Sequence, residues 1–139
     1  MLKYMKRLIA LILLVIPITV FSQSNLIFNT TSYAFATINS QGTYKWDDWE
    51  KCKIRIVINT ESDIVVIYSK VTQKYYIYDT YNNGEAYYDD QGGKQIKFYV
   101  IDQDGDKGYM RLRIEKNGNS QIYIDFNDCA WCYNVYRVN

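Results

Sequence analysis

The sequence predicts an all-β protein: an antiparallel meander of eight or nine strands that closes into an up-and-down barrel of lipocalin-like shape. Three observations predict it. After residue 22, apolar side chains alternate with polar ones in short runs, and no segment keeps helical spacing for long. The gaps between the runs are short and polar, which permits only antiparallel neighbours. The chain has 15 tyrosines and a single proline, Pro17, a composition that favours uninterrupted strands.

The first 22 residues have the pattern of a secretion signal. Lys3, Lys6 and Arg7 precede an apolar run from Leu8 to Phe21, and Ser22 supplies the small residue at which a signal peptidase cuts. The run is shorter than the roughly 20 residues that a membrane-spanning helix needs. We therefore expect a signal peptide over residues 1–22 and a single β-barrel domain over residues 23–139. The mature protein is expected to be secreted or periplasmic, with no stable membrane insertion after cleavage.

Nine segments of the mature chain have the alternation of strands. They are residues 32–39, 51–59, 63–69, 73–80, 85–89, 94–102, 108–115, 121–127 and 131–138. Turn-forming residues separate them, as in Asn82-Asn83-Gly84 and Asp90-Gln91-Gly92-Gly93. Closure into a barrel would leave no open edge. A two-layer β-sandwich is the alternative, because the sequence does not say whether the last strand pairs with the first.

The strands over residues 94–102, 108–115 and 121–127 can be paired from their pattern. Each carries its apolar side chains on one face: Ile96, Phe98 and Val100, then Met110, Leu112 and Ile114, then Ile122, Ile124 and Phe126. These faces match only if each hairpin has a three-residue loop with glycine in the left-handed third position. The loops are then Gln103-Asp104-Gly105 and Lys116-Asn117-Gly118. Phe98 lies opposite Met110, and Leu112 opposite Ile122.

The other face of these three strands is a mixed aromatic and charged surface, and such a surface can stand in water. It carries Lys97, Tyr99, Tyr109, Arg111, Arg113, Tyr123 and Asp125.

Charge and composition exclude several functions. Cleavage of the leader removes three basic residues and no acidic residue. The mature chain then has 13 of the 16 basic residues and all 15 acidic residues, so its net charge is −2. We therefore expect no nucleic-acid partner. The absence of histidine excludes histidine-based triads and zinc sites that need imidazole.

Acidic residues are the remaining acid–base groups. A two-carboxylate glycoside hydrolase is thus the enzyme class left open, with Asp47, Asp48 and Glu50 beside two tryptophans as the first place to look. Asp102-Gln-Asp-Gly-Asp106 resembles the start of a calcium loop but lacks the later glycine and glutamate of an EF-hand. We expect a non-enzymatic protein with no catalytic residue, cofactor or bound metal.

The chain has three cysteines, an odd number for an oxidising compartment. Cys129 and Cys132 are three apart in a predicted strand, so they point to opposite faces and cannot easily bond to each other. We expect a structural disulfide from Cys52 to one of them, and we assign Cys132 as the partner.

The leading functional hypothesis is a binding domain that holds a small molecule or glycan through aromatic side chains, since tyrosines exceed what one core requires. The candidate ligand-binding residues are Trp46, Trp49, Tyr76, Tyr78, Tyr99, Tyr109, Arg111 and Tyr123. The alternative is a structural or protein-interaction subunit of the cell envelope or secreted fraction. A tyrosine-lined internal cavity would favour the ligand, and a filled interior with a flat aromatic outer face would favour a protein partner.

Several short motifs are similar to those of one protein family. They are Trp46-Asp-Asp-Trp-Glu-Lys-Cys52, Ile67-Tyr-Ser69, Asp102-Gln-Asp-Gly105, Arg111-Leu112, Ile122-Tyr-Ile-Asp125 and Tyr133-Asn-Val-Tyr136. The chain resembles, over residues 46–139, a family of small exported β-rich proteins of Bacteroidota and their phages. The resemblance implies a bacterial exported β-domain and no particular reaction. The region around Cys129 and Cys132 departs from the family pattern.

Overall fold

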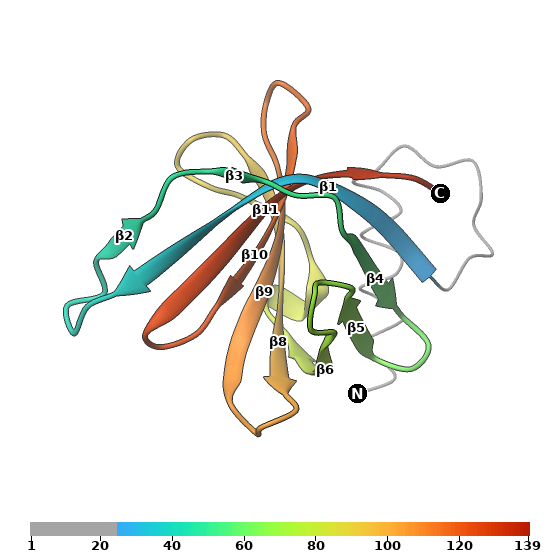
Figure 1. Cartoon of the computed structure of the whole chain (residues 1–139). Coiled ribbons are helices and arrows are strands. Elements are labelled where there is room, and N and C mark those ends of the chain that lie inside the picture. Colours follow the sequence, from blue (N-terminus) through green and yellow to red (C-terminus); the bar gives the residue numbers. More distant parts are fainter. Residues whose placement is uncertain (1–24) are drawn as a thin grey trace.

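The computed structural model describes residues 25–139, and the predicted signal peptide lies outside these described residues. Strands dominate residues 25–139, with one short 3-10 turn and no α-helix (Figure 1). The elements are β1 (Asn25–Ile38), β2 (Tyr44–Trp46), β3 (Glu50–Lys51), β4 (Arg55–Asn59), β5 (Ile64–Ile67), β6 (Gln73–Thr80), η1 (Asn82–Gly84), β7 (Tyr87–Tyr88), β8 (Lys94–Asp102), β9 (Lys107–Ile114), β10 (Ser120–Asp125) and β11 (Cys129–Arg137). Within this part of the chain, no helix is long and apolar enough to span a membrane.

Eight of the strands form a closed antiparallel barrel. Their order is β1, β4, β5, β6, β8, β9, β10 and β11, and β11 pairs with β1 to close the ring. The predicted up-and-down barrel is therefore confirmed, and the β-sandwich alternative is wrong, because the last strand pairs with the first. Three short strands lie outside the ring: β2 and β3 pair with β1, and β7 pairs with β8.

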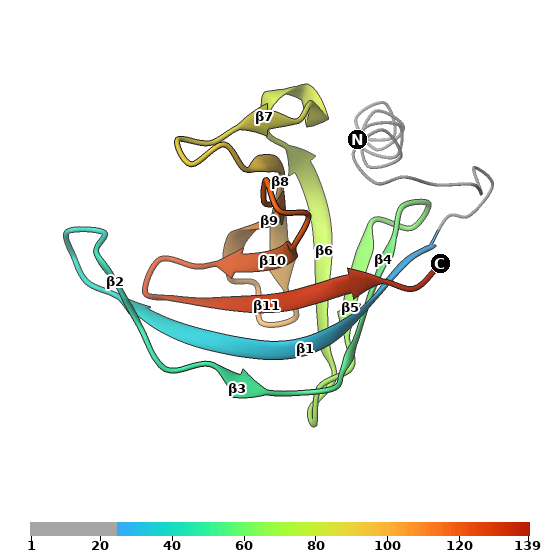
Figure 2. The ribbon, with the colours of Figure 1, turned by 90° about the horizontal axis from the view of Figure 1, so that it is seen from above.

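The long first strand is irregular at a β-bulge. Its pairing with β11 shifts between Thr30 and Ser32, which leaves Thr31 as the extra residue. Before the bulge β1 also pairs with β4, and after it with β3 and then β2. The segment over residues 44–59, which runs antiparallel to β1, is therefore divided into three strands: β2, β3 and β4. The strand β2 was not among the predicted strands. Seen from above, β2 lies at the left end of β1, and β7 lies above β8 (Figure 2).

Side chains fill the barrel interior. Each of the eight strands contributes to one core, in which Phe28, Ile56, Phe98 and Ile122 are at most 1% exposed. Ile96, Val100, Met110, Leu112 and Ile124 also belong to this core, as their alternation predicts. The interior therefore resembles a packed domain core more than the ligand cavity of a lipocalin.

The predicted hairpins are confirmed in register and in loop length. Phe98 pairs with Met110, and Leu112 pairs with Ile122. Backbone hydrogen bonds join residue 102 to residue 106 and residue 115 to residue 119, which leaves three residues in each loop. The third loop residue has a φ of 88° at Gly105 and 90° at Gly118, a conformation that glycine adopts without steric cost.

Candidate functional site

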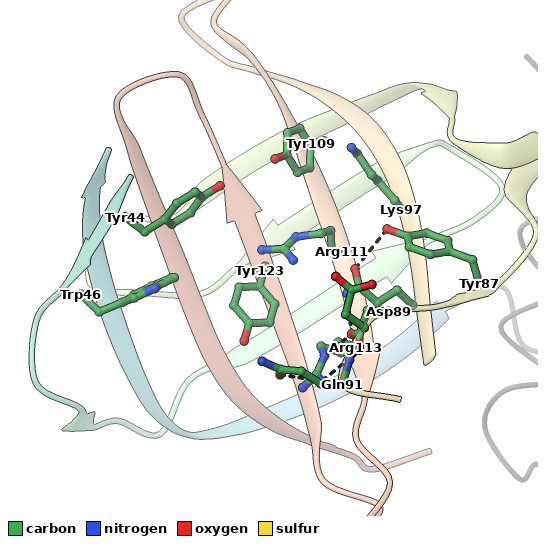
Figure 3. Close-up of a pocket in the computed structure, with 12 residues that line it drawn as sticks. Tyr44, Trp46, Tyr87, Asp89, Gln91, Lys97, Tyr109, Arg111, Arg113 and Tyr123 are labelled. Atoms are coloured by element: carbon green, nitrogen blue, oxygen red, sulfur yellow. Dashed lines mark hydrogen bonds and ion pairs between the residues drawn. The ribbon is translucent and has the colours of Figure 1, made fainter. Parts of the chain in front are cut away.

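An open groove of about 540 Å³ runs over the outer face of the barrel, between β2 on one side and the β7–β8 turn on the other (Figure 3). We call it the outer groove. Its lining residues are Tyr44, Trp46, Tyr87, Asp89, Asp90, Gln91, Gln95, Lys97, Tyr109, Arg111, Arg113 and Tyr123.

The floor of the outer groove comes from β8, β9 and β10. Lys97 pairs with Arg111 across β8 and β9, and Arg111 pairs with Tyr123 across β9 and β10. Gln95 likewise pairs with Arg113. Because successive strand residues point to opposite faces, these side chains lie outward between the inward core positions. The same alternation that packs the core therefore places a row of polar and aromatic side chains on the floor.

A buried carboxylate fixes the centre of the floor. The Asp125 side chain is 0% exposed, and its Oδ2 accepts a hydrogen bond from Arg111 Nε at 2.9 Å. Its Oδ1 accepts one from the Tyr44 hydroxyl at 3.0 Å. Burial raises the pKa of Tyr44 well above its ordinary value, so the hydroxyl stays protonated and donates to Asp125. Arg111 Cζ also lies 4.2 Å from the Tyr123 ring centroid, which orients the guanidinium further.

A second ion pair fixes the turn between β7 and β8. Asp89 Oδ2 accepts hydrogen bonds from Arg113 Nε at 2.6 Å and from Gln95 Nε2 at 2.8 Å. Asp89 Oδ1 accepts from the backbone N–H groups of Gln91 and Gly93. The hydrogen bond from Arg113 holds the pKa of Asp89 well below its ordinary value, with smaller contributions from the other donors. The carboxylate therefore ties this turn to the floor of the groove.

Lys97 is the third cation of the floor, and its surroundings differ. Its Nζ lies 3.8 Å from the ring centroid of Tyr109, 5.0 Å from that of Tyr81 and 5.8 Å from that of Tyr99. Among residues 25–139, no carboxylate forms an ion pair with it. Burial, together with the charge of Arg111, lowers the pKa of Lys97.

Aromatic rings form the two walls. Tyr44 and Trp46 stack with their centroids 5.9 Å apart, and Trp46 meets Tyr123 edge to face at 6.1 Å. Trp46 keeps 40% of its surface exposed. On the opposite wall, the Tyr87 hydroxyl donates a hydrogen bond to Gln95 Oε1 at 3.1 Å. Rings therefore border a floor of planar amide, carboxylate and guanidinium groups.

The structure brings together half of the predicted ligand-binding residues. Trp46, Tyr109, Arg111 and Tyr123 line the outer groove. Trp49 lies beside it, in a smaller depression of about 260 Å³ that Trp46 and Tyr123 also line.

The other three predicted residues do not line the groove. Tyr99 borders it through its contact with Lys97, and its ring lies 6.2 Å from that of Tyr78. Tyr76 and Tyr78 remain 41% and 36% exposed on the outer surface.

The prediction found Trp46 but missed the other wall residues, Tyr44 and Tyr87, and much of the polar floor. Tyr44, Tyr87, Asp89 and Gln95 were not candidates, although all four line the groove. The turns Asn39-Ser-Gln-Gly42 and Asp89-Asp-Gln-Gly92 could have indicated the hairpins that carry the wall residues. In each turn the glycine is the third loop residue, as in the two predicted hairpin loops.

The predicted disulfide between Cys52 and Cys132 is wrong, because Cys52, Cys129 and Cys132 are all free thiols. Cys52 packs against the core, and its Sγ lies 3.2 Å from Thr30 Oγ1. Cys132 lies on the outer face, where it pairs with Tyr123. The two side chains are on opposite faces of the sheet and cannot bond. Burial raises the pKa of Cys132 to about 12.

The aspartates of the calcium-like motif serve the hairpin itself. Asp102 Oδ1 accepts hydrogen bonds from the backbone N–H groups of Asp104 and Asp106 at 2.9 and 2.8 Å. This is the bonding of an Asx turn. In the described part of the chain, no three histidine, cysteine or acidic side chains are grouped so that they could hold a metal ion.

No known protein family, curated protein or solved structure matches this chain.

Proposed function

We propose that this protein is an exported, non-enzymatic barrel that binds a glycan in the outer groove. One observation carries the proposal: aromatic walls border a floor of planar polar side chains that ion pairs already hold in place. The C–H faces of a sugar ring stack on aromatic rings, and its hydroxyls pair with amide, carboxylate and guanidinium groups. Preorganised side chains also reduce the entropy lost on binding.

The location of the groove supports an extended ligand. Because the barrel interior is filled, a ligand would bind on the outside and not as in a lipocalin. An open groove on the outer face leaves room for a chain that extends beyond it. The lining is also mostly polar side chains and tyrosines, whereas pockets for apolar small molecules are lined mainly by hydrophobic side chains.

The two ion-paired carboxylates of the site support binding over hydrolysis. A glycoside hydrolase needs one carboxylic acid with a raised pKa to protonate the leaving group. Asp89 has a lowered pKa because Arg113 bonds to it, and Asp125 is buried in its pair with Arg111. Both groups are therefore suited to holding the floor in place.

A glycan array tests the proposal. The full coding sequence is expressed with its leader, and the exported protein is applied as wild type, Trp46→Ala and Tyr88→Ala. Tyr88 is the matched control, since it is 72% exposed and does not line the groove. We expect wild type and Tyr88→Ala to bind the same glycans, and Trp46→Ala to lose roughly tenfold in affinity. An array without signal, or equal binding by Trp46→Ala, would overturn the proposal.

A second candidate function is binding of a partner protein by the exposed tyrosines beyond the groove. Tyr76 and Tyr78 point into solvent, and Lys107 Nζ lies 5.4 Å from the Tyr78 ring centroid. Tyrosines of this kind are frequent at protein interfaces. Native mass spectrometry of the protein taken from its own envelope or medium tests it. A bound protein that is lost in Tyr78→Ala but kept in Trp46→Ala would favour this function, and a free chain in both variants would exclude it.

A further inference from the structure

We propose that the glycan bound in the outer groove is anionic, and that Lys97 binds its carboxylate or sulfate group. The inference rests on the proposed function and adds the chemical class of the ligand. It starts from how the three cations of the floor are partnered.

Two of the three cations already have carboxylate partners. Arg111 bonds to Asp125, and Arg113 bonds to Asp89 and Glu115. Lys97 lies over the faces of three tyrosine rings and interacts with Asp125 only through their charges, and no ion pair to it occurs among residues 25–139. Lys97 is therefore the one cation of the groove floor without an ion-pair partner among residues 25–139.

The position of Lys97 makes that charge available to a ligand. Lys97 is half-buried on the groove floor, opposite Arg111 in the β8–β9 pairing. Burial and the Arg111 charge both disfavour its ammonium form, and the Asp125 charge and the ring faces compensate for this only in part, so its pKa is lowered. An anion would offset both effects, and its hydrogen bond to the ammonium would be charge-assisted.

The two ends of the groove differ in charge. Figure 3 shows Lys97 and Tyr109 together at one end, and Arg113 with Gln91 at the other. The second end also carries Asp89 and the exposed Asp90 on the same turn. Acids at that end would repel an anion there, so the anionic sugar unit would lie at the Lys97 end.

Arg111 offers a further donor at the Lys97 end. Its Nε and Nη2 bond to Asp125, whereas its Nη1 makes no hydrogen bond to the part of the chain that the structure describes. The side chain keeps 21% of its surface exposed. An anion placed on Lys97 would thus lie beside a second, already oriented cation.

Matched glycan pairs test this inference. The array carries galacturonic acid oligomers beside their methyl esters, and sulfated galactans beside desulfated ones. Within each pair the sugars are the same and only the charge differs. We expect wild type to bind at least one acidic member roughly tenfold more tightly than its neutral match. The acid that binds, uronate or sulfate, identifies which anion the groove takes.

Two variants on β8 assign the effect to Lys97. Lys97→Met keeps an unbranched side chain only one atom shorter and removes the charge, and should lose the preference for the acidic member. Lys94→Met is the control, because Lys94 also lies over a tyrosine ring, at 5.8 Å from Tyr88, but does not line the groove. Thermal unfolding verifies that both variants fold.

The outcomes separate the two proposals. Binding of neutral glycans only, or an unchanged acidic preference in Lys97→Met, would overturn the role of Lys97 and leave the groove as a glycan site. No binding of any glycan would overturn the proposed function itself.

Discussion

The inner and outer faces of β8, β9 and β10 are made by the same three strands and are organised in different ways. On the inner face, Phe98, Met110 and Ile124 pack into one core and are at most 1% exposed. On the outer face, Asp125 and Arg113 are nearly as buried, at 1% and 8%, yet they are charged. Burial on the inner face comes from closing the barrel, and on the outer face from two hairpins laid against it.

The difference between the two faces shows what a polar surface needs in order to form a binding site. Inner residues need only to be apolar and of suitable size, because the hydrophobic effect has no direction. Outer residues need partners at defined positions, and those partners are distant in the chain. Tyr44 reaches Asp125 across 81 residues, and Asp89 reaches Arg113 across 24. The outer face is therefore set by long-range hydrogen bonds and the inner face by alternation alone.

The largest effect should come from breaking the inner face. Phe98→Ala removes a fully buried ring from the centre of the core, and we expect the free energy of unfolding to fall by about 4 kcal/mol. Tyr99→Ala, the next residue on the outer face, is the matched control and should cost about 1 kcal/mol. Urea denaturation measures both. Equal costs would contradict the division between the faces.

The alternation that fills the core could be predicted, and so could half of the site. Tyr109, Arg111 and Tyr123 alternate with core positions on strands whose register follows from the pattern, so their common face was fixed by the sequence. The Cys52–Cys132 bond could not be judged in the same way. Which side of the sheet Cys52 lies on depends on the β-bulge in β1 and on where the segment paired with β1 is interrupted. Neither feature can be recognised in the sequence.

Tyr44 and Tyr87 of the walls were missed because three-residue turns were recognised at only two of four places. Asn39, Asp89 and Asp102 each accept backbone hydrogen bonds two and four residues ahead, at 2.8 to 3.0 Å. A glycine with positive φ follows each of them by three positions. This Asx-x-x-Gly spacing would have predicted the β1–β2 hairpin and with it the position of Tyr44 beside Trp46, which was already a candidate.

A smaller loss should follow from breaking the buried ion pair of the outer face. Asp125→Asn removes the charge that holds Arg111, and we expect a cost of about 3 kcal/mol. This is the low end for a buried pair, because Arg111 keeps 21% exposure. The amide has one acceptor oxygen where the carboxylate has two, so it cannot accept from both Arg111 and Tyr44 as Asp125 does. Weakening of the Tyr44 contact should loosen β2, so hydrogen exchange at residues 44–46 should rise. Unchanged exchange there would mean that Asp125 does not hold the wall.

The smallest effect, and the one that sharpens the comparison most, is the pH dependence of the Asp89 pair. Asp89 is ionised and bonded to Arg113 in the folded protein, and this lowers its pKa below the value of about 3.9 for an unfolded chain. The stability that it contributes is therefore complete above that value and is lost as pH falls toward the lower, folded pKa. We expect Asp89→Asn to cost about 1 to 2 kcal/mol at neutral pH. The difference from wild type should stay constant down to about pH 5 and shrink below about pH 4.

Urea denaturation of both proteins between neutral and acid pH measures this difference, and Asp90→Asn is the control. Asp90 is exposed on the same turn and makes no ion pair among residues 25–139, so its variant should stay within about 0.5 kcal/mol of wild type. Phe98→Ala should keep its full cost at each pH, because burial of an apolar ring does not involve a proton. If the cost of Asp89→Asn were also independent of pH, the turn would be held by packing, as the inner face is. The ion pair would then not be what sets the shape of the outer groove.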